Sequence, residues 1–329
     1  MPPEPDPAML TTHGRFDYSA ITARPDFTWP GGKRLAVYVA LNLEAYAFGE
    51  GLIEEIASPG PGPAPDVMNW SWLEYGNRVG GWRLQRMFGE LHLPCTLLVN
   101  AEVYRHCPQL PNAFQAAGAE IAAHGRTNSE RQGNLPEAEE ADLIAAATES
   151  IALGAGARPQ GWLGPWISES AVTPDLLQEA GYRYVLDWCC DDQPIWLKTR
   201  RSKLLAVPYP QELNDSNTVI GRRVNPDDFA DMIIDNFGEM RTQAAEQPLV
   251  MGVSLHAHCA GQPFRLKHFR RALAEIGKAL PDVWVTTAGA IADHFITTSA
   301  ATETAHRERD HITRPAVLHT LPLQGDFHD

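Results

Sequence analysis

Apolar, strand-like runs alternate with helix-like segments for about 260 residues, and this alternation limits the possible folds more than any other feature. Short apolar runs such as 34–42, 95–100 and 249–255 are typical of parallel strands covered on both faces. Amphipathic segments such as 78–91 and 226–244 separate such runs. No linker long enough to divide two domains interrupts the pattern. We therefore expect one α/β unit with parallel strands, built as a barrel.

The two ends of the chain lack this pattern. Residues 1–30 are rich in proline, and we expect them to form an N-terminal arm. Residues 31–297 would form the single barrel domain, and residues 298–329 a polar C-terminal tail. The tail carries four histidines without metal-ligand spacing, and we interpret it as a segment that could cover a neighbouring subunit.

Composition and charge narrow the class of partner. The formal net charge of −14 disfavours nucleic acid and anionic membranes as partners, because neither would be attracted to such a field. Residues 1–7 lack the features of a signal peptide, and no apolar run approaches the roughly 20 residues of a membrane span. The five cysteines show no zinc-like spacing and suit a reducing compartment. We expect a cytoplasmic protein with a small-molecule substrate.

Polar side chains gather where the predicted strands end. One histidine there would more often be structural than functional, but several strand ends with acidic or histidine side chains indicate a site, because substrates bind at that end of a parallel barrel. The clusters are Asn42 with Glu44, His124 with Asn128, Asp187 with Asp191 and Asp192, and His256 with His258.

The residue types suggest acid–base chemistry. Glu44 is the natural general base, and His256 is the natural acid for a leaving nitrogen or oxygen. Asp191 and Asp192 could orient a histidine or bind substrate N–H groups, or they could form an acidic turn before Pro194. His258 would face the site with His256 only if the strand continued. Nucleophilic catalysis is less supported, because the sequence has no GxSxG motif.

Several strings, in this order, resemble the motifs of the polysaccharide-deacetylase superfamily. The resemblance covers about residues 30–297 and points to the cytoplasmic branch that contains metal-independent allantoinases and cyclic-imide hydrolases besides unusual peptidoglycan deacetylases. The strings that carry it are Asn42-Leu43-Glu44, 72–80, His124-Gly125-Arg126-Thr127-Asn128, Gly161-Trp162-Leu163-Gly164-Pro165, Asp191-Asp192-Gln193-Pro194, Glu212-Leu213-Asn214-Asp215, Leu255-His256 and 261–265.

The resemblance implies a distorted seven-stranded (β/α) barrel, with the site at the carboxyl ends of the strands, in a homo-oligomer (tetramer or dimer). Its implied catalytic residues are Glu44, His124 and His256. The side chains that we expect to bind substrate are Asn128, Trp70, Trp72, Arg78, Trp166, Asp191, Asp192, Asn214 and His258.

The resemblance also bears on the metal. Metal-dependent members bind it with an Asp-Asp pair after the first strand and with two histidines four residues apart. Here the corresponding residues are Glu44-Ala45 and His124 with Asn128. Alanine cannot bind a metal, and a neutral amide is a poor zinc ligand. We expect no metal cofactor; if zinc were bound, Glu44 and His124 would be its ligands.

A further departure lies in the third motif. The usual arginine is missing there, since 163–166 reads Leu-Gly-Pro-Trp, and Arg78 or Arg126 could supply the charge.

Three functions are compatible with these residues. The leading hypothesis is hydrolysis of a C–N bond in a small cyclic amide, imide or ureide, with Glu44 activating water and positioned N–H donors stabilising the oxyanion. The second is metal-dependent N-deacetylation of an amino sugar or small acetamide. The third is an inactive binding scaffold, against which the joint presence of Glu44, His124 and His256 argues.

Overall fold

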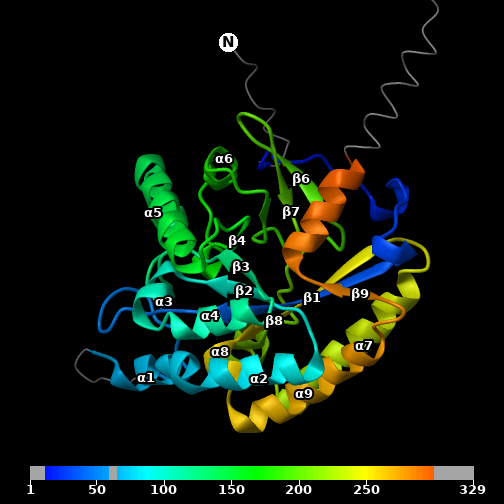
Figure 1. The fold of residues 1–329 in the computed structure, drawn as a ribbon. Coiled ribbons are helices and arrows are strands. Elements are labelled where there is room, and N and C mark those ends of the chain that lie inside the picture. Colours follow the sequence, from blue (N-terminus) through cyan, green and yellow to red (C-terminus); the bar gives the residue numbers. More distant parts are fainter. Residues whose placement is uncertain (1–11, 59–64, 300–329) are drawn as a thin grey trace, which may run out of the picture.

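A curled sheet of mainly parallel strands forms the centre of the computed structural model, which describes residues 12–58 and 65–299 (Figure 1). Among these residues the sheet has nine strands in the order β6-β7-β5-β4-β3-β2-β1-β8, with β9 paired to β1. They are β1 (Leu35–Leu43), β2 (Thr96–Val99), β3 (Glu120–Ala123), β4 (Gly161–Trp162), β5 (Tyr184–Val185), β6 (Ile195–Lys198), β7 (Lys203–Ala206), β8 (Leu249–His256) and β9 (Trp284–Thr286).

The barrel-like α/β architecture predicted from the alternation is confirmed. The strand number exceeds the seven expected, in part because the stretch 188–203, which the sequence pattern assigns to a loop, contains β6, a strand antiparallel to β7. The strands β4 and β5 have only two residues each, so the strand pairing is short on that side of the barrel.

Strand β1 organises the core. All nine of its residues are buried, as its continuous apolar run predicts. Its register pairs Leu43 with Val99 of β2 and Asn42 with His256 of β8. The carboxyl ends of three strands therefore meet at one edge of the sheet, and the residues that follow them lie close together.

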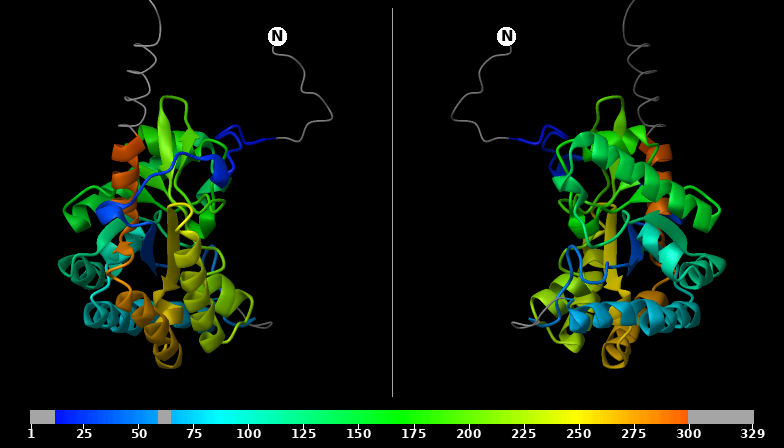
Figure 2. Two further views of the ribbon diagram at one scale, coloured as in Figure 1. Left: turned by 90° about the vertical axis from the view of Figure 1, so that its right-hand side faces the viewer. Right: turned by 90° about the vertical axis from the view of Figure 1, so that its left-hand side faces the viewer.

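Helices cover the outside of the sheet (Figure 2). In chain order they are α1 (Val67–Tyr75), α2 (Gly81–Leu91), α3 (Ala101–His106), α4 (Gln109–Ala116), α5 (Glu137–Ala155), α6 (Thr173–Glu179), α7 (Pro226–Gln243), α8 (Ala257–Ala260) and α9 (Pro263–Lys278). The pair α7 and α9 packs through Phe229 and Phe269, whose ring centroids lie 5.3 Å apart. The helix predicted at 78–91 begins earlier, because α1 and a π-helical segment lead directly into α2, and α3 is not expected from the sequence pattern.

Two glycines let the π-helical segment, Gly76–Gly80, touch the short helix α8. A Cβ on Gly80 would overlap the carbonyl oxygen of Ala257, and one on Gly76 would lie 2.7 Å from the backbone nitrogen of His258. Only glycine permits so close an approach of two backbones. This contact fixes the place of α8 and hence of His258.

Among residues 12–58 and 65–299, no continuous strand ladder closes the curled sheet. Strands β6 and β8 are the two ends of the main path, and segment 207–217 lies across the gap between them. It touches β8 through an isolated bridge between Asn214 and Ser254, with a hydrogen bond of 2.9 Å from the Ser254 nitrogen to the Leu213 carbonyl oxygen. We call segment 207–217 the closing segment.

The described part of the arm packs on the barrel. Arg15 pairs with Asp175, Arg24 pairs with Asp191, and the Trp29 indole donates to the carbonyl of Leu249. A last helix spans 288–299, so it runs past the predicted barrel boundary at residue 297. The rest of the predicted tail lies outside the described residues.

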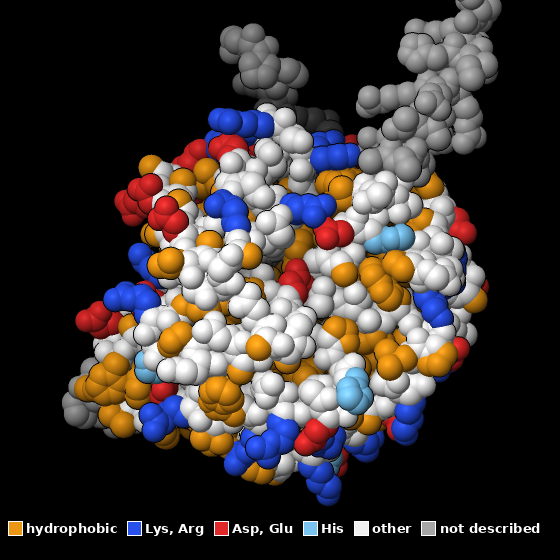
Figure 3. Space-filling model, viewed as in Figure 1, with side chains coloured by type: hydrophobic (Ala, Val, Ile, Leu, Met, Phe, Trp, Pro, Cys, Tyr) orange, Lys and Arg blue, Asp and Glu red, His pale blue; other side chains and the backbone are white. Residues whose placement is uncertain are grey.

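The surface is mixed in charge. Basic and acidic side chains are interspersed over the face in Figure 3. Among the described residues, every helix is too short or too polar to cross a membrane.

Candidate active site

The carboxylate of Glu44 is the centre of the polar cluster at the carboxyl edge of the sheet. It directly follows β1 and is only 7% exposed. Its Oε1 accepts a hydrogen bond of 2.6 Å from Asn128 Nδ2, and its Oε2 accepts one of 3.0 Å from the Tyr46 hydroxyl. A buried carboxylate needs such donors, because it has lost its hydration.

Three histidines surround this carboxylate. His124 Nε2 lies 3.5 Å and His256 Nε2 3.7 Å from Glu44 Oε1. His258 Nδ1 lies 3.9 Å from Oε2. The structure thus brings together the three residues predicted to be catalytic, and it adds His258, which sits on α8 and faces the site although the strand has ended.

Asp215, in the closing segment, holds His256. One carboxylate oxygen lies 2.7 Å from His256 Nδ1, and the other accepts the His256 backbone N–H at 3.1 Å. Nδ1 therefore carries a proton, and Nε2 faces Glu44. Burial lowers the pKa of His256, but the charges of Glu44 and Asp215 outweigh it and raise the pKa to about 9. His256 is an imidazolium at neutral pH.

The pKa of Glu44 is shifted in the opposite direction. Burial raises the pKa of its carboxyl, but the neighbouring His256, His124 and His258 overcome this effect and lower the pKa to about 2. Two groups whose pKa values are pushed apart in this way suit the roles of base and acid.

The backbone after β4 fixes the orientation of His124. Its Nδ1 lies 2.8 Å from the carbonyl oxygen of Leu163, so Nδ1–H donates there and Nε2 points at Glu44. Leu163 begins the stretch in which the expected arginine is missing. Arg126 pairs with Glu130 on the surface and Arg78 is exposed, so the structure does not show either of them supplying that charge.

A chain of side-chain amides fixes the direction of Asn128. The Ala45 backbone N–H can only donate, and it donates to Asn100 Oδ1 at 2.8 Å. Asn100 Nδ2 must then donate, and it reaches Asn128 Oδ1 at 3.0 Å. Asn128 consequently presents its amino group to Glu44.

These contacts do not fit the metal-ligand set implied by the resemblance. Ala45 offers only a methyl group, and Asn128 directs N–H toward Glu44 where a ligand would direct a lone pair. Among the described residues, a different group could hold a cation: ligand atoms of Glu44, Glu54 and His258 lie within 4.8 Å of one another. In that group His258 Nε2 is already 2.9 Å from Glu54 Oε2.

The predicted tryptophans line the site or support it. The Trp70 indole donates to the Tyr46 carbonyl at 3.0 Å, and the Trp166 indole donates to the Asn128 carbonyl at 2.8 Å. The Trp72 ring meets the His258 ring edge-on, with centroids 4.7 Å apart. Asn214 instead accepts backbone N–H groups at the start of the segment 216–221, so it shapes the closing segment next to Asp215.

The structure does not bring Asp191 and Asp192 to Glu44. The backbone carbonyl of Asp192 accepts from Val250, near the start of β8, while His256 ends that strand. Six residues of strand correspond to about 20 Å. Asp191 and Asp192 lie there because they precede β6, which is antiparallel to β7. The chain must therefore return to the other end of the barrel before β6 begins.

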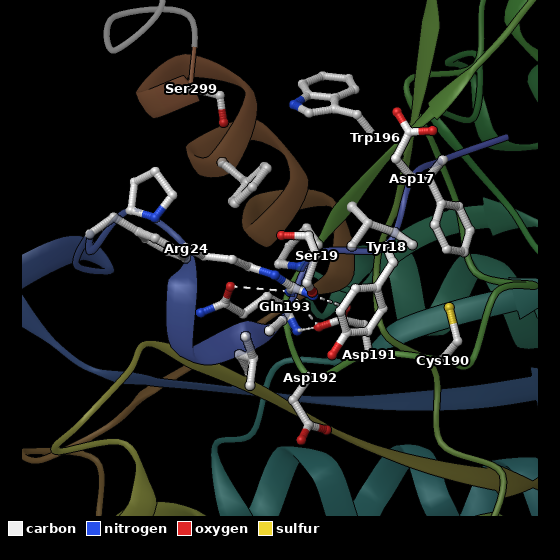
Figure 4. Close-up of a pocket in the computed structure, with 18 of the residues that line it drawn as sticks. Asp17, Tyr18, Ser19, Arg24, Cys190, Asp191, Asp192, Gln193, Trp196 and Ser299 are labelled. Carbon is white, nitrogen blue, oxygen red and sulfur yellow. Dashed lines mark hydrogen bonds and ion pairs between the residues drawn. The ribbon is translucent and has the colours of Figure 1, made fainter.

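There Asp191 pairs with Arg24 in the wall of a cavity of about 880 Å³ between the arm, β6 and the last helix (Figure 4). This cavity is separate from the Glu44 cluster, none of whose residues line it.

Four residues of the site were missed in the sequence: Tyr46, Glu54, Asn100 and Asp215. Asn100 follows β2 directly, so the rule that placed Glu44 and His124 at strand ends would have found it. Tyr46 lies two residues after Glu44. Asp215 lies in a string noted only for its resemblance, and Glu54 lies in an irregular loop without a local signal.

No protein-family model matches the chain. A putative polysaccharide deacetylase of Schizosaccharomyces pombe is 25% identical over 292 residues, which are 80% of this chain and 91% of that protein. A peptidoglycan deacetylase of Helicobacter pylori is 24% identical over 254 residues, 68% of this chain and 85% of that protein.

Two solved structures share the fold closely. A probable polysaccharide deacetylase from Pseudomonas aeruginosa PAO1 superimposes with a TM-score of 0.73 at 28% identity, covering 83% of this chain and 94% of that one. The Puue allantoinase gives a TM-score of 0.73 at 28% identity, covering 86% and 99%. Together with the strand-end site described above, these similarities support the resemblance to the polysaccharide-deacetylase superfamily and indicate a hydrolase of carbon–nitrogen bonds other than peptide bonds.

Proposed function

We propose that the protein hydrolyses a C–N bond in a small cyclic amide, imide or ureide without a metal. The observation that carries this proposal is the amino group of Asn128, which is hydrogen-bonded to Glu44 where the superfamily's metal site would need a ligand. The similarity to an allantoinase, at 28% identity over nearly that whole chain, supports a cyclic substrate.

Glu44 and His256 divide the proton transfers between them. Glu44 takes a proton from water as the oxygen adds to the substrate carbonyl, which gives a tetrahedral intermediate. His256 then gives its Nε2 proton to the ring nitrogen as the C–N bond breaks, and the carbonyl carbon becomes a carboxyl group. Proton transfer from Glu44 back to His256 restores the resting pair.

The two groups are coupled through their charges. The imidazolium of His256 is the main opponent of burial in lowering the pKa of Glu44. As His256 gives up its proton, that charge disappears and the pKa of Glu44 rises. After that step the carboxyl can hold the proton taken from water, until it passes this proton back to His256.

Neutral donors next to Glu44 would stabilise the oxyanion. Burial raises the pKa of the Tyr46 hydroxyl well above its ordinary value, so it stays protonated and can donate. The Tyr46 oxygen and Asn128 Nδ2 are 3.4 Å apart, which places two donors side by side. Preorganised donors of this kind each contribute about 3 kcal/mol in acyl-transfer enzymes.

A second function is favoured by a specific observation. Glu44, Glu54 and His258 could ligate a divalent cation, which would act as a Lewis acid on the carbonyl of an amino sugar or small acetamide. The deacetylase names of the relatives agree with this activity. Such a site would take Glu44 away from its role as a free base.

A turnover screen of hydantoins, cyclic imides, ureides and N-acetylated sugars, each with and without chelator, tests the proposal. We expect ring opening that survives chelation, and loss of that activity in Glu44→Gln. Stoichiometric zinc in protein purified without added metal, together with activity that chelation abolishes and zinc restores, would overturn it in favour of the deacetylase. Equal turnover by wild type and Glu44→Gln on every compound would indicate a binding scaffold.

A further inference from the structure

The loop that follows β4, residues 163–169, is backbone-strained. Trp166 and Ile167 adopt φ values of 61° and 52°, in the left-handed region. That region is costly for a β-branched side chain such as Ile167, so surrounding contacts must hold the loop in place. Strain of this kind is concentrated at functional sites.

This loop makes two contacts on which the active site depends. The Leu163 carbonyl accepts from His124 Nδ1 and thereby fixes which ring nitrogen faces Glu44. The Trp166 indole donates to the Asn128 carbonyl. Any movement of the loop would disturb the orientation of both side chains.

Two carboxyl groups, that of the half-buried Glu169 and that of the buried Asp187, join the loop to the end of β5. Glu169 ends the loop, and Asp187 follows β5. The outer oxygens are satisfied, since Asp187 Oδ1 accepts the Gly164 N–H at 2.8 Å and Glu169 Oε2 accepts the Trp188 indole N–H at 3.1 Å. The inner oxygens, Glu169 Oε1 and Asp187 Oδ2, are buried and have no hydrogen-bond partner among the described residues.

The two side chains lie near enough to form a hydrogen bond with each other, but neither of their inner oxygens has a partner while both groups are ionised. Two carboxylates cannot make that bond, and two adjacent negative charges out of water repel strongly, so one proton must lie between them. Burial and the charge of Asp187 raise the pKa of Glu169, and burial raises the pKa of Asp187.

The other titratable groups around the pair do not remove the need for this proton. His124 lowers the pKa of Asp187, whereas Glu140 of α5 raises the pKa of Glu169. The charge of Glu169 raises the pKa of Arg15 of the arm, but Arg15 is paired with Asp175. The charge of Asp187 raises the pKa of Cys189.

We propose that Glu169 and Asp187 are positioning residues of the hydrolytic site: the proton they share clamps the strained loop 163–169 in the conformation that orients His124 and Asn128. When the proton is lost at high pH, two buried charges repel, and the loop loses the contact that balances its strain. His124 then loses the Leu163 carbonyl, and turnover falls.

Two substitutions of Glu169 distinguish the effect of the shared proton from the effect of side-chain size. Glu169→Gln keeps the shape and donates an N–H that is not lost at high pH. Glu169→Ala leaves Asp187 unpaired. We expect Glu169→Gln to keep turnover within about twofold of wild type at pH 7. Turnover is compared at pH 7 only, because His256 loses its own proton as pH rises through about 9 in both proteins. We expect Glu169→Ala to lose at least about tenfold. Glu130→Gln, at a surface carboxylate, is the matched control and should resemble wild type.

The inference rests on the proposed function for its turnover readout, so a second readout needs no substrate. The His124 Nδ1–H signal, followed by NMR against pH, should disappear at high pH in the wild type and persist in Glu169→Gln. Loss of the signal at the same pH in both proteins would overturn the proposal, whether or not a substrate is found. So would equal behaviour of Glu169→Gln and Glu169→Ala. If Glu169→Ala does not fold, the comparison of Glu169→Gln with wild type decides.

If the signal behaves as expected but no C–N substrate is turned over, the clamp stands and the proposed function fails.

Discussion

Replacing Asp215 with asparagine should convert His256 from a cation to a neutral ring at physiological pH. The backbone N–H of His256 can only donate, so the oxygen of the introduced amide would have to face it, and the amino group would face Nδ1. The ring nitrogen would then have to accept, which excludes the imidazolium. The change also removes a negative charge that is completely buried.

The magnitude follows from the geometry. Two charges about 4 Å apart interact by roughly 4 kcal/mol at an effective dielectric constant of about 20. That energy corresponds to about three pKa units. The pKa of His256, about 9 in the native protein, should therefore fall to about 6.5 or below. At pH 8 the protonated fraction would drop from about nine-tenths to about 3%, and turnover by about 30-fold.

NMR titration of the His256 ring and the pH profile of turnover both measure this change. Wild-type activity should decline as pH rises through about 9, because the acid must be protonated, and in Asp215→Asn the decline should begin near 6.5. Asp191→Asn, a similar charge change at the other end of the barrel, should leave the His256 titration unmoved. A His256 pKa within about half a unit of wild type in Asp215→Asn would refute the reasoning.

The same shift affects stability. Because Glu44 and Asp215 raise the folded pKa of His256 above its unfolded value of about 6.5, their interactions with the ring contribute roughly 3 kcal/mol that is fully present below pH 6.5 and is lost as pH rises through about 9. Asp215→Asn should reduce this pH dependence of the free energy of unfolding.

Three other predictions concern the base, the metal and the fold. Glu44→Gln should lower kcat by about 10³-fold, because the amide cannot accept a proton from water; activity within about tenfold of wild type would exclude Glu44 as the base. The double variant Ala45→Asp/Asn128→His should restore the superfamily's ligand types and bind about one zinc per chain by metal analysis, while wild type stays below that ratio; equal zinc contents would contradict the interpretation of Asn128. Gly80→Ala should destabilise the fold by about 3 kcal/mol in chemical denaturation, since its Cβ would overlap the Ala257 carbonyl oxygen, whereas Gly89→Ala, in open space, should not.

Much of the barrel could be predicted from the sequence because its signals are local. The apolar run at 34–42 corresponds to β1, and the polar residues at the ends of β1, β3 and β8 meet in space as parallel strands require. Glu44, His124 and His256 were found for that reason. The elements missed are short or irregular, such as β6 and α3, where local patterns are weak.

The partners of the site residues could not be predicted in the same way. Asp191 and Asp215 look alike in sequence, each an acidic residue in a polar string after a strand. Only the path of the chain separates them, since β6 carries the first toward Arg24 and the closing segment carries the second to His256. The orientation of Asn128 depends on a backbone N–H at Ala45, and no sequence pattern encodes that hydrogen bond.

The gap between the two ends of the sheet links the integrity of the barrel to the protonation of His256. The segment that spans this gap also carries Asp215, so a molecule whose barrel has opened there loses one of the two charges that raise the pKa of His256. The contact of the closing segment with β8 and the raised pKa of His256 therefore depend on the same segment. A chain that had opened only at this edge would retain Glu44 and both strands around it, but it would have a less protonated and less well oriented His256, so activity would decline before the core unfolded.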